Sequence, residues 1–156
     1  MSSFAVVGLG NPLRGDDGVG IVLIERLREC SVKLPRGVEI LDGGTGGLGL
    51  VHVFSRFETI VVVDAVDFGG KPGAYRFFKL DEVESFSSDI VLSSHEDDFL
   101  KVLSFFKKLD SSPKKVFVFG VQPKSVSYGM KLSSEVEERV GFLVDELIKK
   151  VISVFS

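Results

Sequence analysis

Residues 8–20 read Gly8-Leu9-Gly10-Asn11-Pro12-Leu13-Arg14-Gly15-Asp16-Asp17-Gly18-Val19-Gly20. The apolar run Phe4-Ala5-Val6-Val7 precedes them, and a helical pattern of apolar residues begins near Val19. A strand, a glycine-rich turn and a helix in that order form the opening unit of an α/β sheet. Two adjacent carboxylates stand inside the turn, where a nucleotide-binding loop keeps its backbone free for phosphate. The pair Asp16-Asp17 is therefore the main indication of function.

The composition predicts one domain, spanning residues 1–156, with a buried core, because 44% of the residues are hydrophobic and the mean hydropathy is +0.27. The net charge of −3 gives no electrostatic reason to expect nucleic acid as a partner. The apolar runs are too short to span a membrane, and no signal peptide is visible. The single cysteine, Cys30, excludes an internal disulfide framework and indicates a reducing cytoplasm.

Further strands are predicted at 37–41, 59–63 and 115–120. The second of these is an uninterrupted run of β-branched residues, which is typical of a central strand covered on both faces. Residues 73–80 alternate less cleanly, and we expect an edge strand that could run antiparallel.

Helical spacing of apolar residues predicts helices at residues 19–30 and 48–54. A capping pattern at Ser94 predicts another helix through Phe106, after a long loop at 81–94. A capping box of Ser134 and Glu137 predicts a final long amphipathic helix, which reaches Val151.

This alternation predicts a three-layer α/β/α fold of the phosphorylase/hydrolase-like kind. Its twisted, mostly parallel sheet would have about five strands, with helices on both faces. In such folds ligands bind at the carboxyl ends of the strands. The loops at 8–18, 42–47, 64–70 and 120–125 should therefore open on one edge of the sheet. They bring three aspartates there, namely Asp17, Asp42 and Asp64.

The aspartates have structural interpretations as well as functional ones. An aspartate near the start of a helix can cap it, which contributes about 0.5–2 kcal/mol, but one carboxylate is enough for that role. We therefore expect one of Asp16 and Asp17 to be functional, and either of them could cap the helix. Asp64 follows an apolar strand and must be exposed or paired, which favours it over Asp67. Asp42 is equally suited to forming a turn and to lining a site.

His95 falls in the first turn of a predicted helix, where the helix dipole favours the neutral imidazole that can bind a metal. A single histidine at a helix start is more often structural, and His52 is expected at the rim of the core. Two strand-end aspartates with His95 would form a mixed oxygen and nitrogen site without thiolates. Such a site could leave coordination positions open for substrate or water.

Several segments together resemble one family, the hydrogenase maturation endopeptidases that process the large subunit of nickel–iron hydrogenases. The matching segments follow the order of the family over nearly the whole chain: Gly8–Leu13, Asp16–Gly20, Asp42–Thr45, Val63–Asp67, Pro72-Gly73, Ser94-His95, Gly120–Pro123 and Leu132-Ser133. A set of motifs in this order is far more specific than a single glycine loop.

The resemblance implies an endopeptidase that cuts a short C-terminal extension from the large-subunit precursor after nickel insertion. Two acids and a histidine are thought to contact that metal in the family. Carried over by motif, these catalytic and metal-contacting residues are Asp17, Asp64 and His95, which leaves Asp16 as the cap of the helix. The nickel is supplied by the substrate, so no tightly bound cofactor is expected, and we expect a monomer. The substrate-cleft candidates are Asp16, Asp42, Gly43, Gly44 and Thr45.

A peptidyl-tRNA hydrolase also opens with a strand and Gly-Leu-Gly-Asn-Pro. It would need a Thr-Arg-His-Asn segment soon afterwards, which carries its catalytic histidine. Here no histidine occurs before His52, and the acidic balance disfavours tRNA.

A dinucleotide-binding module would use Gly8 and Gly10 for pyrophosphate and Asp42 for ribose. The third glycine of that fingerprint is replaced by Leu13, and the two aspartates that follow would repel phosphate. Titration with nicotinamide nucleotides tests this alternative, because tight binding would support a dinucleotide-binding module.

A third alternative keeps the fold without the cutting activity, as a hydrogenase-assembly or nickel-binding protein. All three metal-contact positions hold competent ligands, and the sequence alone leaves this alternative open.

Overall fold

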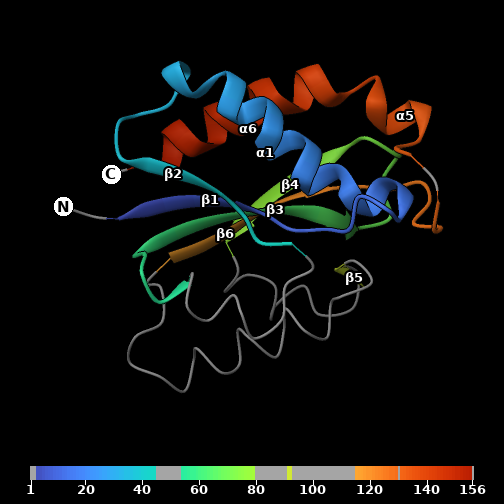
Figure 1. Ribbon diagram of the computed structural model, residues 1–156, viewed down its shortest axis with the longest axis horizontal. Helices are drawn as coiled ribbons and strands as arrows, with labels where there is room; N and C mark the ends of the chain where they lie inside the picture. The colour runs from blue at the N-terminus through green and yellow to red at the C-terminus, as the bar shows by residue number, and fades with distance from the viewer. Residues whose placement is uncertain (1–2, 45–53, 80–90, 93–114, 130, 156) are drawn as a thin grey trace.

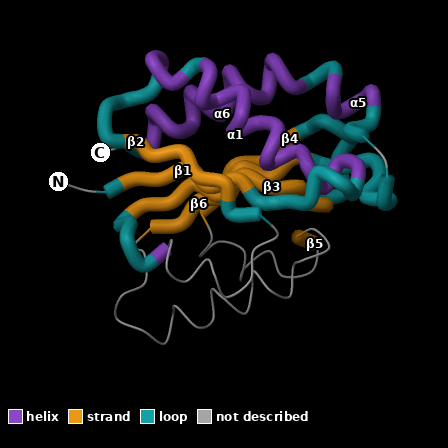
Figure 2. Tube along the Cα trace, in the orientation of Figure 1, coloured by secondary structure: helices purple, strands orange, loops and turns teal. Residues whose placement is uncertain are grey.

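The computed structural model describes residues 3–44, 54–79, 91–92, 115–129 and 131–155. In this part of the chain a twisted sheet carries helices along one face (Figure 1). Figure 2 shows the same arrangement, with the strands side by side beneath the helices. Among the described residues, no helix has the length and apolar character needed to cross a membrane.

The strands of the sheet run mostly parallel. Their order is β2 (Val38–Asp42), β1 (Phe4–Gly8), β3 (Thr59–Asp67), β6 (Lys115–Val121) and β4 (Tyr75–Lys79). The first four are parallel to one another, whereas β4 is antiparallel to β6 at the edge of the sheet. A two-residue strand, β5 (Val91–Leu92), pairs antiparallel with the end of β3. The predicted five-stranded, mostly parallel sheet and its antiparallel edge strand are confirmed.

Two long helices, α1 (Val19–Glu29) and α6 (Val140–Val154), cover one face of the sheet (Figure 1). Their buried apolar residues recur at helical spacing and form one core cluster with residues of β1, β3 and β6. The 3-10 turns η1 (Gly15–Gly18) and η2 (Ser31–Lys33) flank α1, and α5 (Ser134–Glu137) precedes α6.

The opposite face of the sheet is buried as well. Ala5, Ile60, Val62 and Val118 form a second core cluster there with Phe54. Successive residues of a strand point to opposite faces, so β3 supplies side chains to both clusters. A sheet buried on both faces is the middle layer of the three-layer α/β/α fold that the sequence predicts.

The central strand is longer than predicted. The sequence places its end at Val63, but β3 continues to Asp67 because β6 pairs with it as far as Ala65 and β5 pairs with its last two residues. Asp64 therefore lies within a strand rather than in the turn after one. The strand β5 also lies inside the stretch 81–94 that was predicted to be a loop.

The start of the C-terminal helix also differs from the prediction. The N-cap is Ser133 rather than Ser134, and its Oγ accepts a hydrogen bond from the backbone N–H of Val136 at 3.4 Å. The predicted single helix is divided into α5 and α6. The helix predicted at 48–54, apart from Phe54, and the helix predicted after Ser94 lie outside the described residues.

Candidate active site

The loop from β1 to α1 is pressed against the carboxyl end of β3. The backbone N–H of Leu9 donates to the carbonyl oxygen of Val63 at 2.8 Å. At the start of α1, a Cβ added to Gly20 would overlap the carbonyl oxygens of both Leu9 and Val63. Only glycine permits the helix to approach the two strands this closely. As a result η1, which carries Asp16 and Asp17, lies against β3.

Asp17 is completely buried within this loop. Its Oδ2 accepts a hydrogen bond from the backbone N–H of Asn11 at 3.0 Å. On the other side, Gly10 has a φ of 139°, and a Cβ there would overlap the carbonyl oxygen of Asp17. The backbone of the loop therefore determines where the Asp17 carboxylate lies.

Asp64 is a buried carboxylate within the central strand, and it is only 1% exposed. Its Oδ1 accepts a hydrogen bond from the backbone N–H of Ala65 at 2.8 Å. In the register of β3 and β6 it stands opposite Gly120, where a Cβ would meet Val66 Cγ2 at 2.6 Å. A carboxylate is costly to bury unless it is hydrogen-bonded, paired or used as a ligand, so this position is unusual for a strand core.

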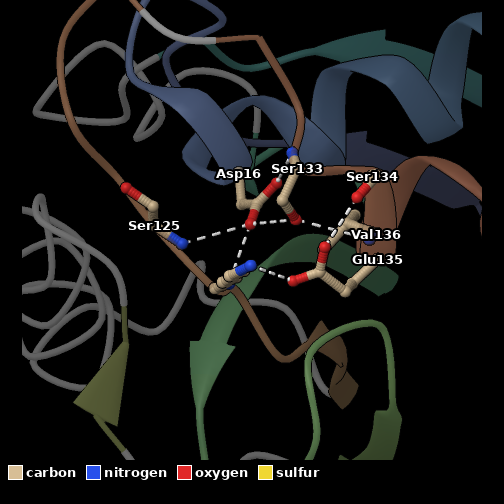
Figure 3. A network of polar contacts seen from close by, with 7 residues as sticks. Asp16, Ser125, Ser133, Ser134, Glu135 and Val136 are labelled. Atoms are coloured by element: carbon tan, nitrogen blue, oxygen red, sulfur yellow. Dashed lines mark hydrogen bonds and ion pairs between the residues drawn. The ribbon is translucent and has the colours of Figure 1, made fainter.

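Asp16 is also 0% exposed, but it holds together segments that are distant in sequence. Its Oδ2 accepts hydrogen bonds from the backbone N–H groups of Lys124 at 2.7 Å and Ser125 at 3.2 Å. The N–H of Ser133 donates to Oδ1 at 2.7 Å and its Oγ–H to Oδ2 at 2.8 Å (Figure 3). The predicted capping role is wrong, because the N-cap of α1 is Gly18 and has no side-chain cap bond. Asp16 instead joins η1 to the segments that follow β6 and precede α5.

An exposed ion pair reinforces this junction between η1 and the segment that links β6 to α5. Lys124 Nζ contacts a carboxylate oxygen of Glu135, the second residue of α5. The hydrogen bond from Lys124, together with one from the Ser134 hydroxyl, lowers the pKa of Glu135 to about 2. The segment between β6 and α5 is thus attached at one buried and one exposed carboxylate.

The second glycine loop lies beside the first. The N–H of Gly43 donates to the carbonyl oxygen of Gly8 at 2.8 Å, and the N–H of Gly10 donates to that of Gly44 at 2.8 Å. Asp42 is exposed, and its Oδ1 accepts the N–H of Gly44 at 2.7 Å within its own turn. The structure therefore brings Asp42, Gly43 and Gly44 next to the β1–α1 loop, whereas Thr45 lies outside the described residues.

Gln122 is a buried residue that was not among the site residues predicted from the sequence. Its Oε1 accepts the N–H groups of Phe68 at 2.9 Å and Gly70 at 3.1 Å, and its Nε2 donates to Asp67 Oδ1 at 3.2 Å. It thereby fixes the loop that follows β3. The available signal was a polar amide directly after an apolar strand, since a buried amide must be hydrogen-bonded.

Comparison of the chain with known proteins identifies the family to which these loops and their buried aspartates belong. The profile of the family described as hydrogenase maturation protease matches residues 21–150. The chain belongs to the hydrogenase maturation protease family. It is 33% identical over 147 residues to the hydrogenase expression/formation protein HupD of Rhodobacter capsulatus, which covers 94% of this chain and 70% of that protein.

Two further comparisons give matches from Escherichia coli. The chain is 30% identical over 144 residues to the hydrogenase 2 maturation protease, which covers 92% of this chain and 87% of that protein. The solved structure of the hydrogenase maturating endopeptidase HybD superimposes with a TM-score of 0.81 at 28% identity, covering 97% of this chain and 93% of that one. These relatives extend the family match to the whole fold.

Membership of this family does not by itself assign a role to each site residue of this chain. Asp17 and Asp64 come to the same edge of the sheet, because η1 lies against β3. His95 lies outside the described residues, so its position relative to the two aspartates stays a prediction. Within the described part of the chain, no three histidine, cysteine or acidic side chains form a group that could hold a metal ion.

Proposed function

We propose that this protein is the endopeptidase that removes the C-terminal extension from the nickel-loaded large-subunit precursor of a nickel–iron hydrogenase. The family match supports the reaction class. The observation that carries the proposal is the pair of buried carboxylates, Asp17 and Asp64, at the carboxyl edge of a parallel sheet. The single cysteine, Cys30, suits activity in the cytoplasm.

In this proposal Asp17, Asp64 and His95 contact the nickel, which arrives as part of the substrate. Carboxylate oxygens and a neutral imidazole are suitable ligands for a divalent first-row metal. The buried surroundings of the two carboxylates exclude water, which strengthens their attraction for a cation. The contact holds the scissile peptide bond beside the metal, so a precursor without nickel is not positioned for cleavage.

The neighbouring turn completes the cleft. Asp42 is exposed and lies in the turn that is hydrogen-bonded to the β1–α1 loop, so it can meet the extension as it approaches Asp17. Gly43 and Gly44 belong to the same turn and are hydrogen-bonded to the β1–α1 loop. Asp16 is excluded from direct contact, because it is buried among donors of the protein itself.

The test is mass spectrometry of a co-expressed hydrogenase large subunit, with and without nickel in the medium. We expect loss of a C-terminal fragment only in the nickel-loaded sample. Asp64→Asn and Asp17→Asn keep the size of the side chain but remove its charge, and both should abolish processing while the protein stays folded. Asp145→Asn, at an exposed position on α6, is the matched control and should process normally. Normal cleavage by D64N would refute the proposed role of that residue.

A further inference from the structure

A pocket of about 290 Å³ adjoins the turn that carries the two aspartates. Gly15 and Gly18, the residues on either side of Asp16 and Asp17, form part of its wall. The rest of the wall includes apolar side chains from the β1–α1 loop, α1, the stretch before α5, and α6, namely Pro12, Val22, Leu132 and Val140. The pocket thus has the size and the lining to receive an apolar side chain.

The charged groups around this pocket are predominantly basic. Arg26 from α1 and Lys131 before α5 contribute two cations, and Glu137 contributes one carboxylate. Within the described residues, neither Arg26 nor Lys131 forms an ion pair. An anionic group that enters the pocket would therefore meet cations that have no intramolecular partner in this part of the chain.

An exposed apolar ridge continues from the pocket. It consists of Leu13, 70% exposed, and Tyr128, 73% exposed. The N–H of Gly129 donates to the carbonyl oxygen of Leu13 at 2.8 Å, and the Arg14 guanidinium lies 4.7 Å from the centre of the Tyr128 ring. Leu13 directly follows Pro12, a residue of the pocket wall, so the ridge begins beside the pocket along the chain.

This surface is firmly attached to the candidate active site. Its two sides belong to the β1–α1 loop and to the segment between β6 and α5, which Asp16 joins through four hydrogen bonds (Figure 3). Large exposed apolar side chains beside a pocket lined by basic groups are typical of a docking site for another chain.

We propose that the ridge and the pocket, together called the tail-docking surface, bind the C-terminal extension of the precursor. An apolar side chain of the extension enters the pocket, and a carboxylate of the same extension meets Arg26 and Lys131. The inference rests on the proposed function, since that function supplies the extension as the occupant. Because Gly18 of the pocket wall directly follows Asp17 in the chain, an extension anchored in the pocket lies close to the site of cleavage.

The first test is steady-state processing of the nickel-loaded precursor by two double variants, L13S/Y128S and R26Q/K131Q. All four positions are exposed, so the fold should be preserved, which circular dichroism checks. Each variant should raise KM about five- to tenfold and leave kcat unchanged, because only binding away from the reacting bond is weakened. The matched control is V32S/K33Q in η2, where Val32 is 93% exposed at the far end of α1. It should leave KM unchanged.

The second test measures binding of a fluorescein-labelled synthetic extension peptide by fluorescence anisotropy, which needs no cleavage. Amidation of all carboxylates of the peptide should weaken binding to the natural protein about fivefold or more. R26Q/K131Q should bind the free and the amidated peptide equally. An unaltered KM in both variants, or an equal loss on amidation in R26Q/K131Q, would overturn the docking proposal. Absence of cleavage by the natural protein, with charge-selective peptide binding retained, would overturn the proposed function alone.

Discussion

The loop after β1 and the loop after β2 lie side by side, both rich in glycine and both carrying an aspartate, yet they are built differently. In the β1–α1 loop, Asp16 and Asp17 are completely buried, whereas Asp42, the last residue of β2 before the second loop, is exposed. A Cβ at Gly20 would overlap two backbone carbonyl groups, whereas a Cβ at Gly44 would meet nothing within 4 Å. Glycine is instead favoured at position 44 because the backbone φ there is 60°, in the left-handed region.

The comparison shows that the same sequence composition can serve two physical purposes. The first loop is part of the core, and its carboxylates are positioned by the strands, by α1 and by distant hydrogen-bond donors. At the second loop, Asp42 is exposed, and it accepts a hydrogen bond from the Gly44 N–H of its own turn. A rigid site for a metal contact belongs in the first environment, and contact with a variable peptide suits the second.

The largest difference in the free energy of unfolding is expected when an aspartate of each region is replaced by alanine. Asp16→Ala leaves three backbone N–H groups and one hydroxyl without their acceptor, which should cost about 3–5 kcal/mol in the free energy of unfolding. Asp42→Ala removes the hydrogen bond to the Gly44 N–H at an exposed turn and should cost about 0.5–1 kcal/mol. Urea unfolding monitored by circular dichroism measures both values. Equal losses would show that burial does not distinguish the two aspartates.

The local structure was largely predictable, because it depends on short-range patterns. The apolar run of β3 and the helical spacing in α1 indicate buried elements directly from residue order. The alternation of these elements then indicates the parallel sheet. What could not be predicted was where β3 ends, because its last residues are held by pairing with β5 and β6 rather than by their own sequence. Asp64 was therefore predicted in the correct region but in the wrong structural context.

The roles within the site were harder to predict than its location. Asp16 and Asp17 are neighbours with the same side chain, and only contacts separate them. The partners of Asp16 lie 108 to 117 residues away along the chain, so no local pattern reveals that it joins two segments. The assignment of Ser134 as the helix cap was wrong by one residue for a similar reason, since Ser133 is fixed by Asp16 as well as by α5.

A smaller difference in stability is expected when one methyl group is added to each loop by a glycine-to-alanine substitution. Gly20→Ala forces α1 away from Leu9 and Val63 and should cost about 3 kcal/mol, because the obstructing atoms belong to the backbone. Gly44→Ala has space for its methyl group, and only the left-handed backbone is unfavourable, at about 1 kcal/mol. Thermal unfolding gives both values. A greater loss in G44A than in G20A would contradict the explanation by close approach.

The smallest effect is expected at the exposed end of the junction, where Lys124 lowers the pKa of Glu135 to about 2. A carboxylate whose pKa is lower in the folded protein stabilises it fully above the unfolded value, near 4.5, and this stabilisation is lost as the pH falls toward 2. In urea unfolding, Glu135→Gln should therefore be slightly less stable than the natural protein at pH 7, and the difference should vanish near pH 2. Because both side chains are exposed, the difference is small, and added salt should reduce it. Glu138→Gln, at an exposed position directly after α5, is the control. If E135Q instead destabilised the protein as much as D16A, the exposed ion pair rather than the buried carboxylate would be the main attachment of this segment.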